Sequence, residues 1–113
     1  MIRIYHNPRC RKSREGLAIL EKSGKEFKVV EYLKDIPTKN ELKDILTKLG
    51  ITAEQLLRKN ESVWKERYKG QNLSEDKIIE AMIENPKLIE RPIVINGDKA
   101  MIGRPPSAIG GIL

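Results

Sequence analysis

The sequence predicts an α/β fold in which helices flank a four-stranded mixed sheet. Three observations predict it: a strand–helix–strand pattern in the first 32 residues, a helical middle, and two short strands near the C-terminal end. The chain has 113 residues, of which 39% are hydrophobic and 34% charged, an ordinary globular composition. We therefore expect a single domain, residues 1–113, with a hydrophobic core of its own.

The N-terminal part has the pattern of a βαβ unit. Residues 2–5 alternate in polarity, as a strand with one buried face does. Residues 11–23 carry apolar side chains at helical spacing, and Gly24 follows at the usual position of a C-terminal cap. Residues 27–32 form the second strand. A right-handed crossover makes the two strands parallel.

The stretch from about 34 to 90 is predicted to be helical. Residues 38–41 and 52–55 are capping boxes that each open a helix, and Ser74 caps a third. Residues 60–73 show no periodic pattern. The stretch is far longer than a crossover between neighbouring strands requires, so we expect a helical insertion between strands two and three.

The last strands are predicted at 92–95 and 99–102, joined by the turn dipeptide Asn96-Gly97 and therefore antiparallel. Residues 105–107 lead into a short C-terminal helix or turn. This order of elements suits the thioredoxin-like arrangement.

Positive charge is concentrated at the N-terminus. The net charge is +6, and residues 1–14 contribute five cations and no acid. A nucleic-acid surface needs cations spread along a face and often aromatic side chains, which make up only 4% here. A local cluster favours a small-anion site, the alternative being a solvated charge run.

The chain has only one cysteine and one histidine, which excludes intrachain disulfides and ordinary zinc sites. One Cys, Cys10, permits no intrachain disulfide, and one Cys with one His, His6, gives no ordinary zinc site, so we expect no metal. There is no apolar run of membrane-spanning length and no signal peptide at the N-terminus. We expect a cytoplasmic protein without a membrane or nucleic-acid partner.

Cys10 lies where the first strand ends and the first helix begins. The first N–H groups of a helix have no internal partner and, with the helix dipole, stabilise an anion there. Arg9 and Arg11 flank it. The position therefore predicts an activated thiolate, although a free cysteine is also often buried and inert.

Residues 6–14, His-Asn-Pro-Arg-Cys-Arg-Lys-Ser-Arg, resemble the active-site segment His-Asn-Pro-x-Cys-x-x-Ser-Arg of glutaredoxin-dependent arsenate reductases. Residues 56–60, 90–94 and 103–105 resemble three further segments of that family, in family order. The resemblance implies a thioredoxin-like fold and a catalytic Cys10. It also implies that three arginines bind the arsenate oxyanion: Arg58, Arg91 and Arg104. Guanidinium groups suit this role because their donors match oxyanion geometry.

The same segments imply supporting roles for His6, Asn7, Ser13, Arg14 and Pro92. The resemblance also implies a cis Arg91–Pro92 bond. From the residues alone, His6 either tunes the thiolate or is a strand-end histidine satisfied by backbone. Ser13 either donates its hydroxyl to the Cys10 sulfur or is a simple cap.

The mechanism follows from the single cysteine. After Cys10 attacks arsenate, the adduct still holds As(V), and its reduction needs a second thiol that this chain lacks. Glutathione is the natural co-substrate, and a glutaredoxin would clear the resulting mixed disulfide. No bound cofactor is expected.

Two alternatives remain. Spx-type regulators are similar in layout but bind RNA polymerase, and many carry Cys-x-x-Cys, where this chain has Cys10 and Ser13. A general glutathione-linked thiol oxidoreductase is the other.

Overall fold

The computed structural model describes residues 1–113 and divides them into two compact units. The first unit comprises Met1–Asp35 and Arg91–Leu113, and the second comprises Ile36–Glu90. The second unit has nearly the bounds of the expected insertion, whereas the expectation of a single domain stays a prediction. None of the helices combines the length and the apolar character needed to cross a membrane.

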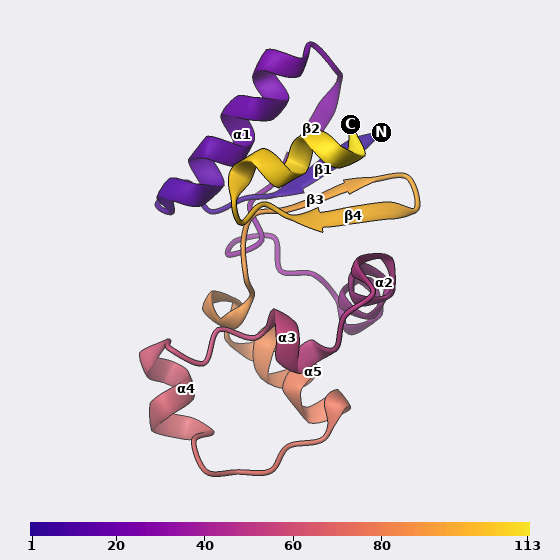
Figure 1. Cartoon of the computed structure of the whole chain (residues 1–113). Coiled ribbons are helices and arrows are strands. Elements are labelled where there is room, and N and C mark those ends of the chain that lie inside the picture. Colours follow the sequence, from indigo (N-terminus) through magenta and orange to yellow (C-terminus); the bar gives the residue numbers. More distant parts are fainter. The chain divides into compact units, whose positions relative to one another are not determined.

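A four-stranded mixed sheet with the order β2-β1-β3-β4 forms the centre of the first unit (Figure 1). β1 (Ile2–Tyr5) pairs in parallel with β2 (Phe27–Val30) and antiparallel with β3 (Ile93–Asn96). β3 in turn pairs antiparallel with β4 (Lys99–Ile102). These strand directions, and the thioredoxin-like mixed sheet with flanking helices, are confirmed.

Two strand boundaries differ from the sequence prediction. β2 ends at Val30, two residues early, and β3 begins at Ile93 rather than at Pro92. Proline has no N–H to give to a strand ladder, which explains the later start of β3. The turn after Asn96 is closed by Gly97, whose φ of 65° lies in the left-handed region that glycine adopts without a steric penalty.

Two helices cover one face of this sheet. α1 (Arg11–Ser23) and the 3₁₀ helix η2 (Pro106–Ile112) contact each other, and both contribute to the same apolar core. That core contains five buried side chains, Ile2, Ile4, Leu20, Val94 and Ile109. Figure 1 shows α1 and the yellow C-terminal segment on the same side of the strands. The apolar face of the first helix therefore fixes the position of its N-terminal end at the end of β1.

The second unit consists of short helices. They are α2 (Lys39–Leu49), α3 (Ala53–Leu56), α4 (Ser62–Arg67), α5 (Glu75–Glu84) and the 3₁₀ helix η1 (Pro86–Leu88). Both predicted capping boxes form, at Thr38 and at Thr52, and Ser74 caps α5. Helix α4 was not predicted: the residue before it, Glu61, makes no side-chain cap, and its sequence has no apolar repeat.

Candidate functional site

Cys10 is the N-terminal cap residue of α1 and has an extended backbone, with φ −94° and ψ 122°. Its N–H donates to the Asn7 carbonyl over 3.0 Å, and its own carbonyl accepts from Arg14 N–H over 3.0 Å. These bonds close the loop between β1 and α1 and begin the helix. The sulfur consequently lies at the positive end of the helix dipole.

The surroundings of the sulfur favour its anionic form. Burial raises the pKa of Cys10, but the N–H of Ser13, a hydrogen bond and charge from Arg91, and the N–H of Lys12 together bring the pKa below its ordinary value of 9.0. The two helical N–H groups act through their proximity, since neither makes a regular capping hydrogen bond to the sulfur. Thiolate is the nucleophilic form of cysteine, so the site is arranged for attack on an electrophile.

Two of the three predicted arginines reach the sulfur. Nη2 of Arg104 lies 3.7 Å from Sγ of Cys10, and Nε of Arg104 donates to the Arg91 carbonyl over 3.0 Å. Arg91 precedes β3 and Arg104 follows β4, so the open end of this antiparallel hairpin brings both side chains to the start of α1. Peptide bond Arg91–Pro92 is cis, as the resemblance implies, and Arg104–Pro105, which was not predicted, is cis as well.

The side chain of Ser13 holds the loop between β1 and α1 and does not contact the sulfur. Its Oγ is fully buried, lies 2.7 Å from Nδ1 of His6 and accepts from the Asn7 N–H over 2.9 Å. Of the two alternatives for Ser13, a hydroxyl hydrogen bond to the Cys10 sulfur is not the one formed: the hydroxyl contacts His6 and Asn7. The reason is geometric: the side chain of Ser13 lies on the buried face of α1, while its N–H points out of the helix end toward the sulfur.

Three of the cations close to Cys10 in the sequence, Arg11, Lys12 and Arg14, bind groups other than the sulfur. Arg11 and Lys12 form ion pairs with Glu15, at 3.1 Å and 4.0 Å. Nη1 of Arg14 donates to the Pro8 carbonyl over 3.1 Å and so holds the loop. Arg91 and Arg104, by contrast, contact the sulfur although they are distant from it in the sequence.

Buried His6 makes the free energy of unfolding depend on pH. Burial lowers the pKa of His6 below its ordinary value of 6.5, although the charge of Glu31 and a hydrogen bond with Ser13 oppose the shift. The unfolded chain therefore takes up this proton at a higher pH than the folded chain does. The stabilisation from neutral His6 is complete above pH 6.5 and is lost as pH falls through that value toward the lower, folded pKa.

Urea unfolding measured from pH about 8 down to about 5 checks this expectation. The chain as it stands loses free energy of unfolding with falling pH, and a His6→Gln variant shows a flatter profile. Identical pH profiles for the two proteins would contradict the account of His6.

Arg58 belongs to the second unit. Its N–H donates to the Leu88 carbonyl over 2.8 Å, and its Nη1 lies 3.7 Å from Oε1 of Glu90, with 21% of the side chain exposed. These contacts fix Arg58 within its own unit. Its participation in the Cys10 site stays a prediction.

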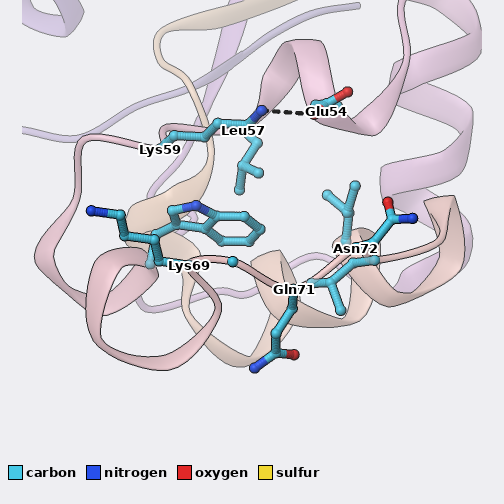
Figure 2. A pocket seen from close by; sticks show the side chains of 10 residues that line it. Glu54, Leu57, Lys59, Lys69, Gln71 and Asn72 are labelled. Carbon is cyan, nitrogen blue, oxygen red and sulfur yellow. Dashed lines mark hydrogen bonds and ion pairs between the residues drawn. The ribbon is translucent and has the colours of Figure 1, made fainter.

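The second unit also holds a pocket of about 260 Å³ that the sequence did not predict (Figure 2). Trp64, Lys59 and Lys69 are among its lining residues, and Lys59 is paired there with Glu54 at 2.7 Å. None of the predicted site residues lines this pocket. No group of three or more His, Cys, Asp or Glu side chains is placed to hold a metal ion.

The chain is similar to known proteins in both sequence and structure. The model of the ArsC family matches residues 5–112. The uncharacterized protein YfgD of Escherichia coli (strain K12) is 47% identical over 110 residues, which are 96% of this chain and 92% of YfgD. The arsenate reductase of Haemophilus influenzae is 46% identical over 112 residues, 97% of each chain. The solved structure of an arsenate reductase from Vibrio cholerae has a TM-score of 0.94 at 45% identity, covering 99% of this chain and 97% of that one.

The matched range contains the loop of Cys10 and all three arginines, and the match extends over nearly the whole chain in sequence and in structure. The chain belongs to the ArsC family.

Proposed function

We propose that this chain is an arsenate reductase that converts arsenate to arsenite through an adduct on Cys10. The observation that carries the proposal is the arrangement of Arg91 and Arg104 against the sulfur at the start of α1. This arrangement offers an anionic nucleophile beside donors that suit a tetrahedral oxyanion. Relatives that match 97% or more of this chain carry the name arsenate reductase.

The first step forms a sulfur–arsenic bond. The Cys10 thiolate attacks arsenic, and one arsenate oxygen leaves as water after taking up a proton. Arsenic remains As(V), because sulfur has replaced oxygen without a transfer of electrons. Repulsion between thiolate and arsenate opposes this step, and Arg91 and Arg104 offset it, since hydrogen bonds between charged groups are stronger than neutral ones.

The second step reduces arsenic. The thiolate of glutathione attacks the Cys10 sulfur, the sulfur–arsenic bond breaks, and its electron pair stays on arsenic, which leaves as As(III) arsenite. Cys10 and glutathione end as a mixed disulfide. The second thiol comes from outside because this chain has no other cysteine, and we propose glutathione as that small-molecule thiol.

The third step restores Cys10. A glutaredoxin thiolate attacks the glutathione sulfur of the mixed disulfide, takes over the glutathione and releases the Cys10 thiol. A low thiol pKa makes Cys10 a good leaving group in this exchange. These reducing thiol systems belong to the cytoplasm, where we place the reaction.

An assay with omitted components tests the proposal. With arsenate, glutathione and glutaredoxin present, arsenite is expected to accumulate over many turnovers. Without any added thiol, no arsenite is expected, because the chain supplies one sulfur and the reduction consumes two. Arsenite is measured by separation of the two arsenic species.

Two results would contradict the proposal. Multiple turnovers without added thiol would exclude the external-thiol mechanism. No arsenite from folded protein in the complete system would exclude arsenate reduction, and binding to RNA polymerase, as in Spx-type regulators, would then become the leading interpretation.

A further inference from the structure

We propose that Gly16 and Gly103 are positioning residues of the Cys10 site. Because they lack side chains, the Pro92 ring can lie between α1 and the end of β4, and this placement sets Arg91 and Arg104 against the sulfur. The inference rests on the proposed function only in taking Cys10 as the reacting group.

The two glycines approach the same two side chains. A Cβ added to Gly16 would lie 2.9 Å from Cγ of Pro92 and 2.9 Å from Cδ1 of Ile109. A Cβ added to Gly103 would lie 2.8 Å and 2.9 Å from those same atoms. Carbon atoms pack at about 3.5–4.0 Å, so a methyl group at either position must displace one neighbour or both.

Ile109 and Pro92 differ in how easily an added methyl group can displace them. Cδ1 of Ile109 is the end of a side chain that can rotate, although Ile109 is fully buried in the core. Cγ of Pro92 belongs to a ring closed onto the backbone, so it can shift slightly by ring puckering, and a larger displacement moves the chain at Arg91–Pro92. Neither Gly16 nor Gly103 has a positive φ, so the absence of a side chain at each serves close approach and not a left-handed turn.

Backbone hydrogen bonds connect the Pro92 ring to both arginines. The N–H of Gly103 donates to the Pro92 carbonyl over 2.8 Å. One residue along on each side, Nε of Arg104 donates to the Arg91 carbonyl over 3.0 Å. A shift of Pro92 therefore moves the carbonyl that orients Arg104 and, at the same time, the Cα that carries the Arg91 side chain.

Gly16 lies six positions after Cys10 on the same helix. A methyl group at Gly16 pushes Pro92 away from α1, and α1 carries the sulfur together with the N–H groups of Lys12 and Ser13. The separation of Arg91 from Cys10 then increases directly. Since Arg91 is the side chain that lowers the pKa of Cys10, the anionic sulfur loses a partner.

The test measures the ionisation of Cys10 from thiolate absorbance against pH in Gly16→Ala and Gly103→Ala. The matched control is Gly110→Ala in η2, where an added Cβ meets nothing within 4 Å. We expect the apparent pKa to rise by roughly one unit in both test variants, the size of one lost charge-assisted hydrogen bond, and to stay unchanged in the control. Circular dichroism establishes that each variant is folded.

Combining each alanine variant with Ile109→Val distinguishes the effect of displacing Pro92 from the effect of displacing Ile109. Ile109→Val removes Cδ1 and so relieves one close contact at each glycine, which also protects the fold. We expect the thiol pKa to remain raised when Gly16→Ala or Gly103→Ala is combined with Ile109→Val, because Pro92 is still displaced.

Three results would overturn the inference. The first is an unchanged thiol pKa in the folded alanine variants. The second is a return of the pKa to its original value when either alanine variant is combined with Ile109→Val. The third is unfolding of both of these double variants, which would give the glycines a packing role alone. None of these measurements involves arsenate. A failure of the proposed function, seen as absent arsenite, is therefore distinguishable from a failure of this inference.

Discussion

Replacing Cys10 by serine is expected to reduce arsenite formation to the level without protein. Serine cannot form the sulfur–arsenic bond or the mixed disulfide with glutathione, and its hydroxyl is not ionised at neutral pH. Arg91, Arg104 and the start of α1 remain in place in this variant, so the oxyanion site is intact while the chemistry is absent. Arsenite measured in the complete assay gives the result directly.

The same substitution is expected to leave the fold intact. Cys10 is the N-terminal cap residue of α1 and makes no regular capping hydrogen bond. Serine is among the preferred capping residues, and a good cap contributes about 1 kcal/mol. The free energy of unfolding in urea should therefore stay constant or rise by up to about that amount. Arsenite formation by the folded serine variant would remove Cys10 from the mechanism.

Truncating Arg91 or Arg104 to alanine is expected to lower arsenate turnover by tens- to hundreds-fold. Each guanidinium faces the sulfur, and a hydrogen bond between charged groups contributes about 1.5–3 kcal/mol, which converts to about that loss in rate. For Arg91→Ala the apparent pKa of Cys10 should rise as well, because this side chain lowers it. Lysine should substitute poorly, since it lacks the planar fork of donors.

Arg58→Ala extends this series to the second unit, where the resemblance alone places an arsenate ligand. We expect a loss of the same order. Arg11→Ala is the matched control: the side chain is 84% exposed and pairs with Glu15, so its removal should leave turnover nearly unchanged. Equal losses in Arg11→Ala and Arg91→Ala would indicate a general charge effect and would contradict a defined oxyanion site.

Local signals in the sequence predicted much of the fold. The capping boxes at Thr38 and Thr52 and the glycine end of α1 are formed as expected, because each depends on residues only a few positions apart. Helix α4 was missed since no cap marks its start. Trp64 is buried in it and stacks on Tyr68, with ring centroids 5.2 Å apart. Such contacts depend on tertiary packing, which periodicity does not report.

The candidate site likewise has features that local sequence predicts and features that only the tertiary fold determines. The position of Cys10 at the start of a helix follows from local sequence, whereas the source of positive charge does not. Arg11 and Lys12 are adjacent in the chain but pair with Glu15, and Arg104, which is distant in the chain, lies 3.7 Å from the sulfur. Sheet pairing determines this outcome. Gly16 and Gly103 carry no chemical signal at all in the sequence, since their role is the space that they leave for Pro92.

Intact-protein mass spectrometry of a reaction with arsenate and glutathione, in the absence of glutaredoxin, tests the central claim most directly. The account predicts that the protein gains the mass of one glutathione on Cys10, in an amount equal to the arsenite released, and that the reaction then stops. Arsenite in excess of the modified protein, or arsenite released while Cys10 stays unmodified, would contradict it.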